Sequence, residues 1–247
     1  MISMKDRLSR TEILLGKEAM EKIANSRVAV FGIGGVGGYA MEALARSGVR
    51  TLDIIDSDRV AASNLNRQII ATRDTIGQLK VDVAKKRIND IDPEIVVNTY
   101  DCFYLPEERD GFPVGDYDFI VDAIDTVTAK IDLIFSAKEF NVPIISAMGC
   151  GNRIDPTQIR IGDLYKTSGD PLAKVMRREL RKKGIKKLTV VYSLEKPIEP
   201  IKDSEAYISQ MNDEDNKKRS VPGSTAFVPA AAGLAMASYV IRELIRD

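Results

Sequence analysis

A glycine-rich turn in the first half of this 247-residue chain is followed by polar residues that could perform chemistry. The turn contains Gly32, Gly34, Gly35 and Gly37, and it lies between an apolar run and a helical pattern. Gly32 permits a tight turn, Gly34 lets the backbone approach a phosphate, and Gly37 lets the helix pack against the strand. The free N–H groups at a helix start attract anions. The turn therefore predicts a nucleotide site.

An acidic residue follows the turn at the spacing expected for ribose binding. Asp56 ends the next apolar run, about 20 residues after the turn, where a carboxylate can accept hydrogen bonds from ribose hydroxyls. Asp58 lies two residues later and belongs to the same predicted site. A glycine turn without a ligand is the alternative, which the combination of strand, helix and acid disfavours. These features do not separate NAD from ATP.

The residues that follow Asp56 do separate the two ligands. Asn64 and Arg67 lie three residues apart, and Lys80 comes soon afterwards. A triphosphate needs such cations, whereas an oxidoreductase has no need of them beyond the pyrophosphate. Asp125 follows a later apolar run, where a carboxylate is well placed to hold Mg²⁺ against phosphate. Taken singly, Asn64 could be a turn residue, and Arg67 and Lys80 could be solvated surface charges.

Composition excludes several other chemistries. The chain has no histidine, which excludes histidine bases, histidine metal ligands and Ser-His-Asp triads. Cys102 and Cys150 form no CxxC pair, so we expect no disulfide framework and a cytoplasmic location. The net charge is zero, so any charged partner must meet a local patch. The start of the chain lacks a signal-peptide core, and the apolar stretch 226–241 predicts a buried helix, not a membrane span.

Short apolar runs alternate with helical patterns through the first 150 residues. Strands are predicted at 28–31, 51–55, 95–99, 117–124 and 142–146, and helices at 7–24, 34–47, 75–89 and 129–140. This alternation predicts an α/β fold with a doubly wound, mostly parallel sheet.

The second half has a different rhythm. Residues 159–161 and 188–193 are strand-like, and a final helix is expected to open at Pro229. Residues 195–222 predict a long mobile crossover loop, most disordered at 211–220. We therefore expect one domain over 1–247, in which 150–222 form an insertion with a basic helix and this loop.

The basic helix begins with Asp170 as N-cap and Pro171 at the first helical position. Eight basic residues and one acid lie between 174 and 187. Against a neutral chain, such a stripe indicates a contact with a nucleic-acid phosphate backbone, and a solvated helix face is the alternative. The predicted contact residues are Lys174, Arg177, Arg178, Arg181 and Lys182.

The motifs GIGGVGG, IDSDRVAASNLNRQ, IGQLK and VDAIDT resemble the ubiquitin-activating superfamily, which includes the MoeB, ThiF and HesA-like adenylyltransferases. The resemblance implies a Rossmann-like domain that binds ATP and Mg²⁺. It implies that Asp56 holds the ribose, that Asn64, Arg67 and Lys80 contact the triphosphate, and that Asp125 binds Mg²⁺. The nucleotide-binding set is Gly32, Gly34, Gly35, Gly37, Asp56, Asp58, Asn64, Arg67 and Lys80, and the catalytic set is Arg67, Lys80, Asp125 and Arg10. The segment RLSR at residues 7–10 resembles a motif whose second arginine, here Arg10, reaches the phosphates of a neighbouring subunit, which implies a homodimer. From the residues alone, Arg10 would be an exposed helix charge.

The basic segment and the run GSTAFVPAAAGL resemble one branch of this superfamily, the tRNA threonylcarbamoyladenosine dehydratases (TcdA/CsdL). That branch implies tRNA as substrate and an ATP-dependent cyclisation of its threonylcarbamoyl group. The substrate carboxylate attacks the α-phosphate, pyrophosphate leaves, and the carbamoyl group then closes the ring and expels AMP. The substrate supplies the nucleophile, so no cysteine or histidine of the enzyme is required. A sulfur-relay or cysteine desulfurase partner is left open.

Two other functions remain open at this point. An adenylyltransferase could activate the C-terminal glycine of a ubiquitin-like or sulfur-carrier protein. Many such enzymes carry two CxxC zinc pairs and a crossover-loop cysteine, which this chain lacks. Cys150 is expected to be a small buried residue in a tight turn. The other candidate is a binding module or NAD-linked oxidoreductase, which would bind NAD and release no pyrophosphate.

Overall fold

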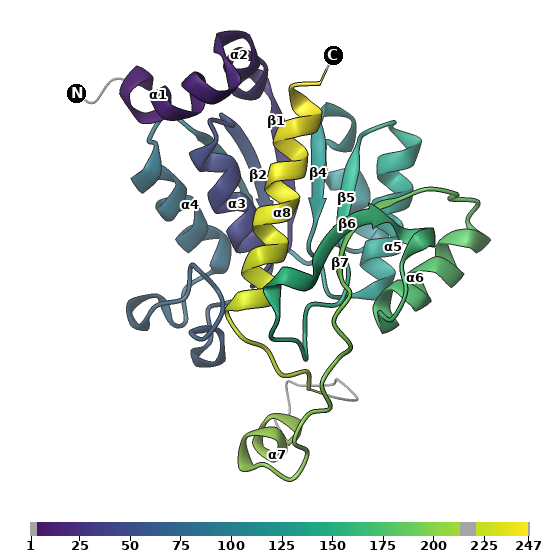
Figure 1. Cartoon of the computed structure of the whole chain (residues 1–247). Helices are drawn as coiled ribbons and strands as arrows, with labels where there is room; N and C mark the ends of the chain where they lie inside the picture. Colours follow the sequence, from purple (N-terminus) through teal and green to yellow (C-terminus); the bar gives the residue numbers. More distant parts are fainter. Residues whose placement is uncertain (1–3, 213–220, 247) are drawn as a thin grey trace.

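A seven-stranded sheet forms the centre of the computed structural model, which describes residues 4–212 and 221–246 (Figure 1). The strand order is β3-β2-β1-β4-β5-β7-β6, and only the β6–β7 pairing is antiparallel. The strands are β1 (Arg27–Phe31), β2 (Thr51–Ile55), β3 (Val96–Tyr100), β4 (Phe119–Asp122), β5 (Ile144–Ala147), β6 (Ile159–Asp163) and β7 (Thr189–Ser193).

Helices cover both faces of this sheet. The helices are α1 (Met4–Leu15), α2 (Lys17–Asn25), α3 (Gly37–Arg46), α4 (Lys80–Ile91), α5 (Val127–Glu139), α6 (Pro171–Lys182), α7 (Glu205–Met211) and α8 (Phe227–Leu244). The sheet is covered by α3, α4, α5, α6 and α8, whereas α1 and α2 lie at one end of the molecule and α7 at the other (Figure 1). Val28 and Val30 of β1 belong to the core cluster under α3, α4 and α8, whereas Ala29 and Phe31 belong to the cluster under α5 and α6. A strand buried on both faces explains why the apolar runs in the sequence are continuous.

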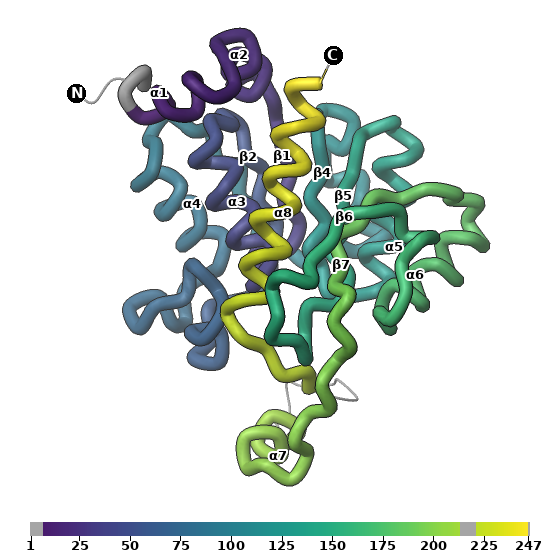
Figure 2. Tube along the Cα trace, viewed as in Figure 1, coloured from purple at the N-terminus to yellow at the C-terminus, as the bar shows by residue number. Residues whose placement is uncertain are grey.

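The order of the strands reverses beside β1. The chain runs from β1 outward through β2 to β3, and then returns to the other side of β1 for β4 and β5. In open parallel sheets, ligands bind at this reversal, outside the carboxyl ends of the strands. The end of α8, together with α1 and α2, lies at the opposite end of the molecule from α7 (Figure 2).

The predicted fold class is confirmed, with two local corrections. The predicted helix 75–89 is wrong at its start, because α4 begins at Lys80. Gly77 has a φ of +86° and Ile76 is 44% exposed, so this stretch forms a turn. The predicted loop 195–222 contains α7, and its part at 213–220 lies outside the described residues.

The predicted apolar helix is α8, which begins two residues before Pro229. It is the one described helix whose length and composition alone would suffice to span a membrane. Val228, Ala232 and Met236 are fully buried in the core, and Gly233 lets α8 approach α3 closely. A Cβ added at Gly233 would lie 2.3 Å from the backbone oxygen of Val36. These contacts agree with the prediction of a buried helix.

Candidate nucleotide-binding site

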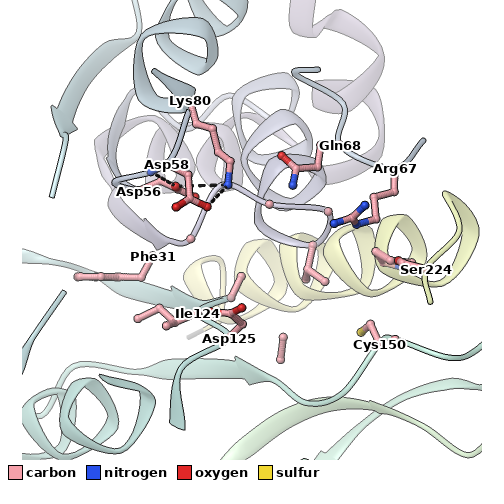
Figure 3. Close-up of a pocket in the computed structure, with 18 of the residues that line it drawn as sticks. Phe31, Asp56, Asp58, Arg67, Gln68, Lys80, Ile124, Asp125, Cys150 and Ser224 are labelled. Carbon is pink, nitrogen blue, oxygen red and sulfur yellow. Dashed lines mark hydrogen bonds and ion pairs between the residues drawn. The ribbon is translucent and has the colours of Figure 1, made fainter. Parts of the chain in front are cut away.

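A pocket of about 440 Å³ opens at the carboxyl ends of β1, β2, β4 and β5. The glycine turn, the loop before α4 and residues 147–151 contribute to its walls. Lys80, Gln68 and Arg67 reach into it from one side, and Asp125 and Cys150 lie on the other side (Figure 3). Eight of the nine residues of the predicted nucleotide-binding set line it, namely Gly32, Gly34, Gly35, Asp56, Asp58, Asn64, Arg67 and Lys80.

The glycine turn has the geometry that its sequence predicts. Gly32 has a φ of +87°, and a Cβ added there would lie 2.8 Å from the backbone oxygen of Ala123. Gly37 is buried and does not line the pocket. A Cβ at Gly37 would lie 1.8 Å from the backbone oxygen of Gly32, so its role is the close packing of helix and strand.

Asp56 follows β2 and braces the glycine turn. Its carboxylate accepts hydrogen bonds from the backbone N–H groups of Ile33, at 2.6 Å, and Asp58, at 2.9 Å. Burial raises the pKa of Asp56, and the ammonium of Lys80, 3.5 Å away, partly opposes this shift. The carboxylate lies at the end of β2 beside the glycine turn, and its role as the ribose ligand stays a prediction.

Lys80 is the first residue of α4 and is only 4% exposed. Its Nζ lies 2.6 Å from Oδ2 of Asp58 and 3.5 Å from Oδ1 of Asp56. A buried ammonium between two carboxylates is fixed in position, and it borders the cavity. A cation held at this position is suited to binding a phosphate group in the cavity.

The loop between β2 and α4 supplies the other polar groups. Oδ1 of Asn64 accepts a hydrogen bond from the N–H of Ala61 at 3.0 Å, which shapes the loop. The Arg67 guanidinium donates to the backbone oxygen of Ser63 at 2.8 Å and to the side chain of Asn66 at 2.9 Å. Partial burial lowers the pKa of Arg67. The contact of Asn64 is therefore structural in this conformation. The contacts of Arg67 hold its guanidinium at the pocket.

Gln68 is a pocket residue to which the sequence assigned no role. It is 7% exposed, and its Oε1 is buried without a hydrogen-bond partner among the described residues. A buried polar atom without a partner destabilises a fold. Its position beside Arg67 makes Gln68 available to a ligand in this pocket. The signal in the sequence was its place directly after Arg67.

Asp125 lies at the pocket, across from the cations (Figure 3). No group of three or more metal-binding side chains occurs in the part of the chain that the structure describes. Mg²⁺ at a nucleotide is typically held by one or two carboxylates together with phosphate oxygens, and a single exposed aspartate fits that requirement. Asp125 is thus a suitable protein ligand for a magnesium ion brought in with a nucleotide.

A buried ion pair below the pocket was missed by the sequence reasoning. Lys130 Nζ lies 2.9 Å from Asp122 Oδ2, and both side chains are fully buried. The same carboxylate oxygen accepts from the Ser146 hydroxyl at 2.6 Å, and Lys130 donates to the backbone oxygen of Ile124 at 3.1 Å. The pair joins β4, β5 and α5 beneath the segment that carries Asp125. A lysine within an apolar helix was the available signal.

Replacing Lys130 by methionine is expected to lower the free energy of unfolding by about 3–5 kcal/mol, because Asp122 would keep a buried charge without its partner. Urea denaturation followed by circular dichroism measures this change. Lys138→Met on the same helix is the control, since Lys138 is exposed and its loss should change stability by less than about 0.5 kcal/mol. Equal stability of the two variants would contradict the importance of the pair.

The raised pKa of Asp56 predicts a pH dependence of nucleoside binding. Its carboxylate becomes protonated at a higher pH than an ordinary aspartate as the solution is acidified. Adenosine has no phosphate to titrate. We expect its affinity to fall as the pH is lowered through the raised pKa of Asp56, because a strong ribose acceptor is lost. Calorimetric titration at several pH values measures it. Asp56→Asn should bind more weakly at all these values and lose this pH dependence, and a flat profile for the unsubstituted protein would argue against Asp56 as the ribose ligand.

The two cysteines are poor candidates for chemistry. Burial raises the pKa of the Cys150 thiol to about 12, and burial also raises the pKa of Cys102. Both line the pocket, but a thiol whose pKa is raised provides little thiolate. Cys150 lies three residues after β5 and is buried, as the sequence predicts.

The predicted basic residues of α6 gather around a second pocket. Among the described residues, Lys174, Arg177, Arg178, Arg181 and Lys182 alone line this hollow of about 420 Å³. Arg177 differs from its neighbours, because its guanidinium donates to the backbone oxygen of Thr167 at 3.0 Å and also to the Thr167 hydroxyl. The other four side chains are exposed. Arg177 is thus committed to the fold in part.

Arg10 does not line the pocket of its own chain. It is exposed on α1, which lies at the opposite edge of the sheet from the carboxyl ends of the strands (Figure 1). A single chain therefore does not bring Arg10 to the nucleotide pocket.

Known proteins resemble this chain over its length. The model of the ThiF family matches residues 8–247. The tRNA threonylcarbamoyladenosine dehydratase of Bacillus subtilis is 44% identical over 245 residues, which cover 99% of this chain and 96% of that protein. The enzyme of the same name from Escherichia coli is 34% identical over 252 residues, with 98% and 94% covered.

Solved structures give the same result. The E. coli tRNA N6-threonylcarbamoyladenosine dehydratase TcdA in complex with ATP has a TM-score of 0.86 and 33% identity, and the alignment covers 99% of this chain and 97% of that chain. The same enzyme with AMP has a TM-score of 0.86 and 34% identity, with the same coverage. Sequence, fold and site geometry lead to one conclusion: this chain belongs to the ThiF family.

Proposed function

We propose that this protein catalyses the ATP-dependent dehydration of threonylcarbamoyladenosine in tRNA through an acyl-adenylate. The observation that carries the proposal is one pocket in which Lys80 and Arg67 face Asp125, beside the start of a basic helix. The similar B. subtilis and E. coli proteins bear this enzyme's name, and the E. coli enzyme binds ATP and AMP. We take residues 1–247 as one ATP-binding domain, with 150–222 as its insertion.

The proposed reaction has two steps. A carboxylate oxygen of the threonyl group attacks the α-phosphorus of ATP, and pyrophosphate leaves. The carbamoyl group then attacks the acyl carbon, loses its proton and expels AMP with the bridging oxygen. One water is lost from the nucleoside overall, and no enzyme nucleophile is used. This agrees with a chain that lacks histidine and whose two thiols have raised pKa values.

The enzyme's part is positioning and charge stabilisation. Asp56 would accept hydrogen bonds from the ribose, while Lys80 and Arg67 would neutralise the triphosphate as charge moves to pyrophosphate. Arrival of the phosphates would draw Lys80 from Asp58, to which it is paired at 2.6 Å. Mg²⁺ held by Asp125 and the phosphates would add further positive charge at the leaving group.

The tRNA would contact α6. Leu172, in the first turn of this helix, lines the nucleotide pocket, and Lys174, Arg178 and Arg181 lie further along its exposed side. A phosphate backbone that follows these cations would be led to the mouth of the pocket. The distance along the helix axis from Lys174 to Lys182 is about 12 Å, at 1.5 Å per residue.

Three further parts of the proposal concern the assembly. Arg10 would reach the triphosphate of a second copy of the chain, which requires a homodimer. A tRNA substrate fits a cytoplasmic location. A sulfur-relay or cysteine desulfurase partner stays an open part of the proposal.

Mass spectrometry of tRNA nucleosides tests the proposal. Unfractionated tRNA that contains threonylcarbamoyladenosine is incubated with the protein, ATP and Mg²⁺ and then digested under mild conditions. We expect the nucleoside to lose the mass of one water, with release of AMP and pyrophosphate. A nucleoside of unchanged mass, combined with pyrophosphate release only when a sulfur-carrier protein is added, would instead establish the alternative adenylyltransferase.

A further inference from the structure

A second buried ion pair joins the floor of the nucleotide pocket to the basic helix. Arg153 Nη2 lies 3.2 Å from Asp170 Oδ2, and the two side chains are 2% and 0% exposed. Neither residue belongs to the groups that face the nucleotide pocket. The proposed chemistry does not use either charge, so their burial requires another explanation.

The Arg153 side chain holds the pocket floor. Its guanidinium donates to the backbone oxygens of Gly149, Gly151 at 3.4 Å, and Glu195 at 3.0 Å. Gly149 and Gly151 line the nucleotide pocket. A Cβ added at Gly149 would lie 3.2 Å from the Asp170 carboxylate and 3.3 Å from the Arg153 guanidinium, so the ion pair lies directly against this turn.

The Asp170 side chain holds the basic helix. Asp170 is the N-cap of α6, and its Oδ1 accepts a hydrogen bond from the N–H of Ala173 at 2.9 Å. The other carboxylate oxygen meets Arg153. One carboxylate therefore caps the start of the helix and ties it to the turn at Gly149. The ion pair therefore connects the first turn of α6 to residues 149–151, while Ala173, Met176 and Leu180 pack the rest of the helix into the core.

Burial of two charges is a poor way to gain stability. Replacing a buried ion pair by apolar residues of similar size is often neutral or stabilising, because both ions lose their hydration. The pair does provide a defined geometry, because the planar guanidinium of Arg153 bonds to carbonyl oxygens and to a carboxylate at fixed angles. The pair thus holds the start of α6 in place relative to residues 149–151.

We propose that Arg153 is a positioning residue, which holds the start of the basic helix at a fixed position relative to the nucleotide pocket. A tRNA bound along α6 then places its carboxylate at the α-phosphate of ATP. This inference rests on the proposed function. A misplacement of about 1 Å can slow a reaction about 100-fold while the separate binding of each substrate survives. Loss of the Arg153 side chain should therefore lower kcat for the dehydration of tRNA.

The test is a double variant that removes both charges together. Arg153→Met with Asp170→Ser leaves no unpaired buried charge, and serine retains an N-cap for α6. We expect a melting temperature within a few degrees of the unsubstituted protein, and Kd values for ATP and for tRNA within about threefold. The kcat for dehydration of tRNA should fall about tenfold or more. Turnover of the free nucleoside threonylcarbamoyladenosine, which does not reach α6, should fall much less than turnover of tRNA, because it is affected only by the lost bonds from Arg153 to Gly149 and Gly151.

Each outcome decides the point. Unchanged kcat with tRNA would overturn the proposal, as would an equal fall for tRNA and free nucleoside, because that pattern marks a general structural role. Should the double variant fail to fold, Arg153→Lys gives the same comparison, since an ammonium keeps the charge but cannot bond to the carboxylate and the carbonyls with the same geometry. The unsubstituted protein is assayed first, and its failure to dehydrate tRNA would refute the proposed function instead.

Discussion

Replacing Lys80 by alanine is expected to reduce ATP-dependent turnover at least about 100-fold and to leave the fold intact. The side chain borders the cavity and is 4% exposed, so no other cation can easily take its place. In the proposed reaction the departing pyrophosphate would develop charge beside Lys80, and the loss of a fixed cation there would remove stabilisation from the transition state. Release of pyrophosphate in the presence of tRNA measures the effect. Arg67→Ala is expected to act in the same direction.

The matched control for Lys80 is Lys85→Ala. Lys85 lies five residues further along α4 and is exposed, so the control removes an equal charge from the same helix. Circular dichroism of both variants checks that the fold is preserved. If both Lys80→Ala and Arg67→Ala turned over ATP at nearly the rate of the unsubstituted protein, the assignment of the triphosphate site to this pocket would be wrong.

Reversing three charges of α6 is expected to weaken tRNA binding at least about tenfold and to change its salt dependence. The variant is Lys174→Glu, Arg178→Glu and Arg181→Glu. Arg177 is left in place because it bonds to Thr167, and its loss would disturb the fold as well as the charge. Each lost phosphate contact should reduce the slope of log K against log salt by about 0.7–0.9, so three contacts should reduce it by about 2–3. Filter binding at several salt concentrations measures the slope.

A control for this variant reverses the same number of charges elsewhere. Lys85, Lys86 and Lys138 are exposed on α4 and α5 and do not line either pocket. Their replacement by glutamate gives the same net charge and should leave the salt slope close to that of the unsubstituted protein. An equal loss of tRNA affinity in both variants would mean that net charge, and not α6 in particular, determines tRNA binding. Unchanged affinity in the α6 variant would mean that the basic side of α6 is a solvated face that does not contact tRNA.

Local patterns were sufficient to predict the sheet and much of the pocket. Strand β2 was predicted with the bounds that it has, because its apolar residues are buried on both faces and Asp56 marks its end. The glycine turn was predictable because Gly32 and Gly37 leave no room for a Cβ. Asp56, Lys80 and Arg67 were found from residue type and spacing along one continuous segment.

Contacts between distant segments were not predictable in the same way. Lys130 meets Asp122 from a helix, and Arg153 meets Asp170 across 17 residues, so neither pair produces a local pattern. The bond from Arg177 to Thr167 likewise depends on how α6 packs. The start of α4 was predicted too early because Ile76 and Leu79 fit a helical spacing, whereas the positive φ of Gly77 decides the turn.

Oxygen labelling tests the central claim, that the tRNA carboxylate is activated at the α-phosphate of ATP. Threonylcarbamoyladenosine in tRNA is labelled with ¹⁸O in its carboxylate and turned over once with unlabelled ATP, and the nucleotides released are examined by mass spectrometry. The account predicts AMP that carries one heavy oxygen, together with unlabelled pyrophosphate. Unlabelled AMP, or ADP with labelled phosphate, would contradict it.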